Sequence, residues 1–294
     1  MRLATRGSAL ALVQAGLIRD RLGQAELVEV SGDHAPDSGD KSRFVRGVEG
    51  ALLEYKAEIG VHSAKDVPSE LPEGLVIAGV PEREEPADAW VGSGESLSDI
   101  PQGARVGTAS LRRRSQLLAL RPDLRIEELH GNVDTRLGRL AARDFDGIVL
   151  AAAGLRRLGR EAEIGFLLAT EEMTPSPGQG ALILQTRSDD DGARDAAAGL
   201  SDNRALTELS AERTVVALLD ASCATPIGVH ASVDGDALSL QAFVGLPDGS
   251  EWIRDLVEGD SARPLVAGEE MGRRLLGAGA AELLERAEID FMGD

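Results

Sequence analysis

Short apolar runs alternate with longer stretches of helical periodicity through the first two thirds of the chain. A strand ending at Thr5 is followed by a helix that Ser8 caps and that runs to about Leu22. Further strands are predicted at Leu27–Val30, Ile59–His62, Leu75–Val80, Arg105–Gly107, Gly147–Ala151 and Ala181–Gln185. Helices are predicted between them at Phe44–Tyr55, Leu111–Leu120, Asp134–Ala142 and Gly154–Leu158. This alternation is typical of an α/β fold with parallel or mixed sheets covered by helices.

The last third of the chain has a different pattern. It predicts one long amphipathic helix, three strands separated by Asp-Gly turns and a final helical stretch, at Asn203–Leu219, Ile227–Val233, Ala237–Val244, Glu251–Val257 and Pro264–Ala287. We therefore expect a separate α+β domain. Two proline-rich clusters, Pro81–Pro86 and Thr174–Gly180, interrupt the earlier pattern and are interpreted as crossings between two α/β domains.

Composition excludes several classes of protein. The 294 residues are 43% hydrophobic and 28% charged, which is ordinary for a folded globular chain, and no apolar run approaches the roughly 20 residues that cross a bilayer. Fifty acidic against 31 basic residues leave a net charge of −19, which disfavours binding to nucleic acid. Only Lys41, Lys56 and Lys65 are lysines, and this acidic, arginine-rich balance indicates a halophilic source. A single cysteine and the lack of a signal sequence predict a cytoplasmic protein.

Arginines recur where predicted strands and helices meet. Arg6, Arg112, Arg113, Arg136, Arg156 and Arg157 all occupy such positions. In open α/β sheets, ligands bind beyond the carboxyl ends of strands, so arginines there favour a carboxylate or phosphate ligand. Each one singly also fits an ion pair on a solvated face, because acidic residues are in excess.

Two further segments carry reactive side chains. Lys65 and Asp66 follow a predicted strand, where the carboxylate can accept a hydrogen bond or stabilise a developing cation, or simply form a turn ion pair. His62 is expected to be a packed strand residue. Cys223 lies between a helix and a strand, and fits either a small buried side chain or a thiolate that forms a covalent bond. The four histidines have no spacing that indicates a metal site.

Seven segments together resemble one family, the porphobilinogen deaminases or hydroxymethylbilane synthases. They occur in the family's order, over residues 1 to about 245: Leu3–Leu12, Val61–Pro68, Gly107–Arg113, Gly131–Arg136, Ala153–Gly159, Gly178–Gly180, and Cys223 followed by Pro226–Gly228. The resemblance implies two lobes like those of periplasmic binding proteins, with mixed sheets, and a smaller C-terminal α+β domain. The expected domains are residues 1–81 with 179–199, residues 86–175, and residues 200–294.

The resemblance also implies an activity. A dipyrromethane cofactor would be held through Cys223, and four porphobilinogen units would be added head to tail, each with loss of ammonia, before hydrolysis releases hydroxymethylbilane. Asp66 would be the catalytic residue. The cofactor would contact Lys65, Asp66, Ser110, Arg112, Arg113, His130 and Arg136, and the substrate Arg6, Ser8, Gln14, Arg157 and Gln179. A monomer without a nucleic-acid, membrane or metal partner is expected.

Two departures from the family pattern change these expectations. His130 stands where the family usually has arginine, which predicts a weaker and pH-dependent carboxylate contact. The loop at 33–44 is shorter than usual, although Lys41 and Phe44 still match and predict a lid. A two-lobed anion-binding module without catalysis remains the alternative, and Cys223 distinguishes the two. An acyl- or phosphate-transfer enzyme using Cys223 and His230 lacks a recognisable supporting base or phosphate loop.

Overall fold

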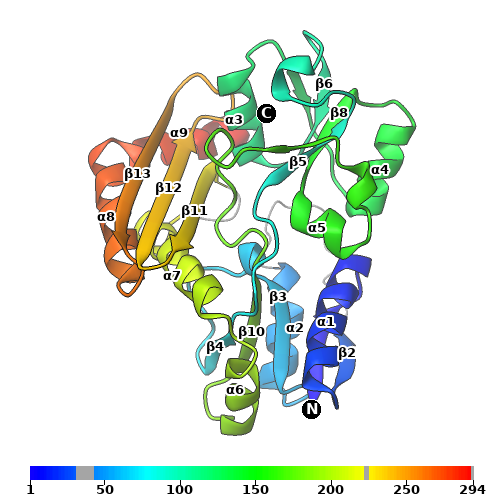
Figure 1. The fold of residues 1–294 in the computed structure, drawn as a ribbon, viewed down its shortest axis with the longest axis vertical. Coiled ribbons are helices and arrows are strands. Elements are labelled where there is room, and N and C mark those ends of the chain that lie inside the picture. Colours follow the sequence, from blue (N-terminus) through cyan, green and yellow to red (C-terminus); the bar gives the residue numbers. More distant parts are fainter. Residues whose placement is uncertain (31–42, 222–224, 293–294) are drawn as a thin grey trace.

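Three sheets organise the chain in the computed structural model, which describes residues 1–30, 43–221 and 225–292. Two of them form an N-terminal lobe and a second lobe above it, and the third lies to the side of both (Figure 1). The first sheet has the order β2-β1-β3-β10-β4. Its strands are β1 (Arg2–Arg6), β2 (Glu26–Val30), β3 (Ile59–Ser63), β4 (Leu75–Gly79) and β10 (Leu182–Arg187).

Helices cover both faces of this first sheet. On one face α1 (Ala9–Leu22) and α6 (Asp191–Ala198) pack through a cluster that includes Leu3, Ile18 and Ile59. On the other face α2 (Arg43–Leu53) packs through Val48 and Leu52. Because both faces are covered, the central strands β1, β3 and β10 are buried along most of their length rather than at alternate positions.

The second lobe repeats this arrangement, with the strand order β7-β6-β8-β5-β9. Its strands are β5 (Asp88–Gly92), β6 (Arg105–Gly107), β7 (Arg125–Glu127), β8 (Gly147–Ala151) and β9 (Phe166–Leu168), and its helices are α3 (Leu111–Leu120), α4 (Val133–Ala141) and α5 (Ala152–Arg157). Helix α3 packs on one face, and α4 and α5 on the other. In each sheet the fourth strand in order, β10 or β5, runs antiparallel to its neighbours.

These antiparallel strands follow directly from the two segments that cross between the lobes. The predicted crossings lie side by side, since the amide of Glu84 donates to the carbonyl of Gly180 at 3.1 Å. After each crossing the chain forms one strand in the lobe that it enters, β5 after the first crossing and β10 after the second. The two sheets are therefore connected at the crossings.

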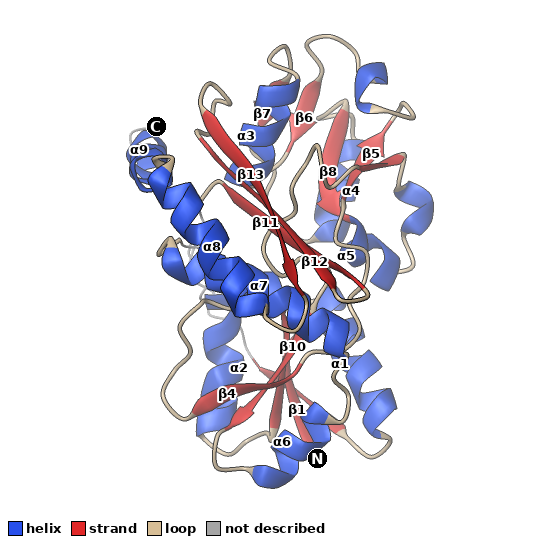
Figure 2. Cartoon of the chain, turned by 60° about the vertical axis from the view of Figure 1, so that its left-hand side comes forward, coloured by secondary structure: helices blue, strands red, loops and turns tan. Residues whose placement is uncertain are grey.

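The third unit is a three-stranded antiparallel sheet with helices on one face. It consists of β11 (Ile227–Asp234), β12 (Ala237–Gly245), β13 (Trp252–Asp260), α7 (Asn203–Leu218), α8 (Pro264–Gly277) and α9 (Ala280–Met292). Helices α7 and α8 lie against this sheet (Figure 2). The single helical stretch predicted over Pro264–Ala287 is wrong: it is two helices, broken at Ala278 and Gly279, where Gly279 has φ of +97°.

Helix α7 also differs from the predicted amphipathic pattern, because its buried face contains the charged residues Glu208 and Glu212. Glu212 accepts hydrogen bonds from Arg83 at 2.7 Å and from the amide of Gly178 at 2.6 Å, one residue in each crossing. It also accepts from the amide of Ala231 in β11 at 2.9 Å. One buried carboxylate thus ties both crossings to the C-terminal unit.

The predicted fold class is confirmed: two lobes with mixed sheets and a smaller C-terminal unit of sheet and helices. Among the described residues, no helix is long and apolar enough to span a membrane. The elements that the pattern missed are α6 and the short strands β5, β7 and β9.

The paired crossings predict a strong effect of one glycine. Gly180 has φ of +86°, and a Cβ atom there would lie 2.2 Å from the carbonyl oxygen of Glu84. We expect Gly180→Ala to lower the free energy of unfolding by about 3 kcal/mol or more, because backbone strain and a collision with backbone act together. Gly159→Ala is the control: it has φ of +67° but nothing within 4 Å, so we expect a loss of only about 1 kcal/mol. Urea unfolding measures both, and equal losses would contradict the close approach.

Candidate active site

A cavity of about 260 Å³ lies between the two lobes, at the carboxyl ends of strands β1, β3 and β8. The N-terminal lobe contributes residues from the β1–α1 connection, from α2 and from the end of β3. The second lobe contributes residues from α3, from the start of α4 and from β8 with α5. The predicted site residues that line this cavity are Arg6, Ser8, Gln14, Lys65, Asp66, Arg113, Arg136 and Arg157.

Positive charge dominates the lining. The cations are Arg6, Lys65, Arg113, Arg136 and Arg157, and the described carboxylates are Asp66 and Asp134. This is the reverse of the whole chain, whose net charge is −19. A cleft with low-dielectric walls focuses the field of its charges, so the cavity attracts anions although the protein as a whole repels them.

Helix caps place two helix N-termini at the cavity. The Ser8 hydroxyl accepts from the amide of Ala11 at 3.3 Å and begins α1. The Asn132 side chain accepts from the amide of Thr135 at 2.9 Å and begins α4. Amide groups at the first turn of a helix carry a partial positive charge, which adds to the attraction of the cavity for carboxylates.

Lys65 and Asp66 lie on a single helical turn, Ala64–Asp66, directly after β3. The amide of Ala64 donates to the carbonyl of Ala181, which holds this turn against the second crossing. Lys65 Nζ donates to Gln179 Oε1 at 3.2 Å. The turn therefore presents a cation and a carboxylate next to each other at the cavity wall.

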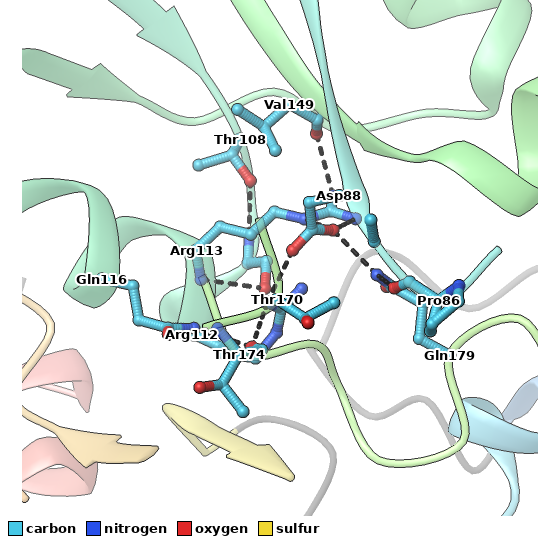
Figure 3. A network of polar contacts seen from close by, with 12 residues as sticks. Pro86, Asp88, Thr108, Arg112, Arg113, Gln116, Val149, Thr170, Thr174 and Gln179 are labelled. Carbon is cyan, nitrogen blue, oxygen red and sulfur yellow. Dashed lines mark hydrogen bonds and ion pairs between the residues drawn. The ribbon is translucent and has the colours of Figure 1, made fainter. Parts of the chain in front are cut away.

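Asp88 is a buried carboxylate that forms an ion pair with Arg113 (Figure 3). Asp88 Oδ1 accepts from Arg113 Nε at 2.9 Å, and Asp88 Oδ2 accepts from Arg112 Nη1 at 2.7 Å. Arg113 Nη1 also donates to the carbonyl of Val149 at 2.9 Å. Burial alone would raise the pKa of Asp88, but the two guanidinium groups lower it well below its usual range. Asp88 is therefore a permanent anion that orients Arg113.

The sequence interpretation missed Asp88. It begins an apolar run, Asp88–Gly92, directly after the first crossing, and this position of a lone acid is the signal that could have marked a buried charge. The sequence does not show which cations compensate this charge, because Arg112 and Arg113 belong to a different element, α3.

Two predicted site residues lie behind the cavity rather than in its lining. Arg112 is buried and donates to Asp88 and to the carbonyl of Thr174. Gln179 is fully buried, and its amide nitrogen donates to Asp88 Oδ1 at 3.0 Å and to the carbonyl of Pro86 at 2.7 Å. Through Gln179, one carboxylate is connected to Lys65 in the first lobe and to Arg113 in the second.

Ser110 and His130 also lie outside the cavity lining. Ser110 caps α3, where its side chain accepts from the amide of Arg113. His130 is exposed, and its Nε2 lies 2.8 Å from Glu128 Oε2. Arg156 forms ion pairs with Glu84 and Glu161. This agrees with the alternative that this arginine pairs with acidic residues on a solvated face. The predicted Lys41 and Cys223 and the side chain of Phe44 lie outside the described residues.

Fold and site together define a two-lobed α/β protein whose interlobe cavity has a cation-rich lining suited to an anionic small molecule. The comparisons with known proteins identify the family. A family model described as "Porphobilinogen deaminase, dipyromethane cofactor binding domain" matches residues 1–195, and "Porphobilinogen deaminase, C-terminal domain" matches residues 206–277. The curated porphobilinogen deaminase of Deinococcus deserti is 40% identical, with 97% of this chain and 98% of that protein covered. The chain belongs to the porphobilinogen deaminase family.

Among solved structures, matches include a TRAP periplasmic solute-binding protein from Roseobacter denitrificans with bound beta-D-glucuronate. It is 12% identical, covers 70% of this chain and 78% of its own, and has a TM-score of 0.41. YhfZ from Shigella flexneri is 17% identical, covers 76% of this chain and 97% of its own, and has a TM-score of 0.35.

The family assignment gives the activity. The chain is a transferase of tetrapyrrole synthesis that condenses porphobilinogen units onto a dipyrromethane cofactor. The cavity fits this chemistry, because each pyrrole ring bears an acetate and a propionate while the lining supplies guanidinium and ammonium groups from both lobes. Arginine pairs with carboxylates through two parallel hydrogen bonds, so the donor set suits a chain of such rings.

The buried charge cluster predicts a pH-dependent stability. The lowered pKa of Asp88 stabilises the fold above the unfolded pKa of about 3.9, and this contribution decreases as pH falls below that value towards the folded pKa. Asp88→Asn removes the anion and leaves two buried guanidinium groups without compensation. We expect it to lower the free energy of unfolding at pH 7 by about 3–5 kcal/mol.

Urea unfolding from pH 7 down to about pH 3 measures this effect. The loss of stability in acid should be smaller in Asp88→Asn than in the wild type, because the variant has no proton to gain at this position. An isosteric change of an exposed carboxylate, Asp20→Asn, serves as the control. Parallel pH curves for the wild type and Asp88→Asn would contradict the role of Asp88 as a buried anion.

Proposed function

We propose that the interlobe cavity is the site of the condensation, with Asp66 as its catalytic carboxylate. The observation that carries this proposal is that Asp66 lines one small cavity together with five cations from both lobes. A carboxylate among cations that hold the substrate's own carboxylates can face the other end of the molecule, where the N–H groups and the departing amine are. Asp66 accepts hydrogen bonds from those N–H groups and stabilises the positive charge that develops as ammonia leaves.

The cations divide between cofactor and substrate. Lys65, Arg113 and Arg136 hold carboxylates of the cofactor, while Arg6 and Arg157 hold those of the incoming porphobilinogen, with Ser8 and Gln14 beside them. When bound, the dipyrromethane group supplies the terminal pyrrole carbon to which a new unit is joined. Arg157 is already oriented, since its Nη2 donates to the carbonyl of Gly180 at 2.7 Å. Burial lowers the pKa of Arg157, but a guanidinium group keeps its charge at neutral pH.

Four residues of the expected set act less directly in this proposal. Arg112 and Gln179 hold Asp88 and so align Arg113 and Lys65 towards a bound carboxylate. Ser110 fixes the first turn of α3, which bears both arginines. His130 joins the contacts to cofactor carboxylates from its exposed place beside Gly131, which lines the cavity.

Cys223 is the attachment point of the cofactor in this proposal, through a thioether. A thiolate adds readily to an electrophilic carbon, and the thioether that forms is stable in neutral water. Lys41 and Phe44 belong to a lid over the cavity. Support for the lid comes from Val45, the residue that follows Phe44 in α2, which lines the cavity.

We assign the substrate and cofactor lobe to residues 1–81 and 179–199, the cofactor-binding lobe to residues 86–175 and the attachment domain to residues 200–294. The strands of each sheet fall within these limits, which supports the division. One chain suffices for the reaction, because the cavity is lined from both lobes of the same chain. A single cysteine suits the reducing cytoplasm, and the net charge of −19 with three lysines suits a halophile.

A two-lobed anion-binding module without catalysis would share the cavity and its cations. It would need neither a covalent cofactor nor Asp66 beside the cations. The two experiments that follow therefore separate the enzyme from the binding module.

The first experiment measures the intact mass of the denatured protein. If Cys223 carries dipyrromethane, the mass exceeds that of the sequence by two linked pyrrole units, and Cys223→Ser lacks this excess and has no activity. The serine variant matters because it keeps the size of the side chain and loses only the sulfur nucleophile. An unmodified mass in active wild-type protein would exclude the attachment.

The second experiment measures turnover of porphobilinogen by Asp66→Asn. The amide keeps the shape of the side chain but cannot stabilise a developing cation, so we expect kcat to fall by about 10²- to 10³-fold with the unfolding temperature unchanged. Asp20→Asn makes the same chemical change on the surface of the same lobe and should keep wild-type turnover. A kcat within about threefold of the wild type in Asp66→Asn would remove this residue from the reaction.

A further inference from the structure

His62 lies on the same wall of the cavity as the predicted catalytic turn. It is the fourth of five residues in β3, four positions before Asp66, and it lines the cavity although only 5% of the residue is exposed. It is packed, as the sequence predicted, but packing alone does not account for its polar contacts.

One ring nitrogen of His62 is held by a buried chain of side chains. Nε2 lies 3.0 Å from Gln185 Oε1 in the neighbouring strand β10, and Gln185 Nε2 donates to Glu49 Oε1 in α2 at 3.0 Å. Gln185 and Glu49 are both buried. Gly60 makes room for this contact, because a Cβ atom there would lie 3.0 Å from His62 Nε2.

This chain determines which nitrogen of His62 carries the proton. The carboxylate of Glu49 only accepts hydrogen bonds, so the amide nitrogen of Gln185 must face it and the amide oxygen must face His62. Nε2 of His62 is therefore the donor. In a neutral imidazole the other nitrogen, Nδ1, then has a lone pair and is an acceptor. Among the described residues, no hydrogen bond to Nδ1 is present.

The ring is neutral when the enzyme works near neutral pH. Burial lowers the pKa of His62 to about 4, outweighing the hydrogen bond to Gln185 and the charge of Asp66, which raise it, while Arg6 lowers it further. His62 therefore does not add to the positive charge of the cavity. It differs in this from the five cations around it.

We propose that Nδ1 of His62 is a substrate-binding acceptor, which takes a hydrogen bond from an N–H group of bound porphobilinogen beside Asp66. A lone pair repels carboxylate oxygens and attracts N–H donors. The cations bind the acetate and propionate end of the molecule, and His62 with Asp66 binds the nitrogen end. His62 thereby orients the substrate, so that its aminomethyl side faces the catalytic carboxylate. The inference rests on the proposed placement of the reaction in this cavity.

Two isosteric variants separate this role from packing. In His62→Gln the amide reaches the position of Nε2, which keeps the contact to Gln185 but removes the acceptor at Nδ1. In His62→Asn the amide lies near the position of Nδ1, which keeps an acceptor there but loses the contact to Gln185. Steady-state kinetics with porphobilinogen and thermal unfolding are measured on both holoenzymes.

We expect His62→Gln to keep its unfolding temperature and to lose about tenfold in kcat/KM, as for one lost hydrogen bond to substrate. His62→Asn should keep kcat/KM within about threefold but unfold roughly 2–8 °C lower, because Gln185 loses its partner. If His62 has a purely structural role, His62→Asn loses more kcat/KM than His62→Gln. That order, or equal kcat/KM in both variants, overturns the proposal.

A third variant tests the proton assignment without changing the cavity lining. Gln185→Met removes the oxygen that holds the proton on Nε2, which lets the ring adopt the other tautomer, and we expect kcat/KM to fall at least about threefold. Wild-type kcat/KM in this variant overturns the assignment. Asp66→Asn in the same assay distinguishes the two levels of inference: if it retains turnover, the proposed site is wrong, whereas a collapse there with unchanged His62→Gln rejects only the role of His62.

Discussion

The ion pair between Asp88 and Arg113 is the interaction on which the site depends. A cavity that grips carboxylates needs guanidinium groups with little water around them, and burying such a charge is costly unless an anion compensates it. Asp88 provides that anion and is itself fully buried. Because the same carboxylate accepts from Gln179, which also accepts from Lys65, it couples cations on opposite sides of the cavity.

The reversal of charge between surface and cavity has a physical consequence. A chain with a net charge of −19 repels a polycarboxylate at long range, but salt at physiological ionic strength already screens exposed charges beyond roughly 8 Å. Steering over long distances then contributes little. Recognition depends on direct contacts within the cavity, where the cations are partly desolvated and the ions of the solvent screen them least. This favours arginines whose orientation is set in advance by protein groups, as Asp88 sets that of Arg113 and Gly180 that of Arg157.

Glu212 extends the same principle to the junction of the lobes. It is fully buried, and Arg83 together with His230 lowers the pKa of this carboxyl although burial alone would raise it. Its partners include the amide of Gly178 and the side chain of Arg83, one from each crossing. If one lobe rotated against the other, the hydrogen bonds of Glu212 to Arg83 and Gly178 would have to move with the lobes or break.

Hydrophobic periodicity determined the α/β class and most long elements, and the proline-rich clusters indicated both crossings, because these signals depend on residues close together in sequence. The motifs likewise pointed to eight side chains that line the cavity, Arg6, Asp66 and Arg157 among them, but also to four that lie outside its lining: Ser110, Arg112, His130 and Gln179. Only the tertiary structure decided how charges are compensated: Asp88 finds its partners on α3, and Glu212 is buried on a helix whose pattern indicated a solvated side. It also placed β5 in the second sheet and β10 in the first, each antiparallel to its neighbours. Periodicity reports which residues are buried, but a buried carboxylate is stable only with partners that distant parts of the chain supply.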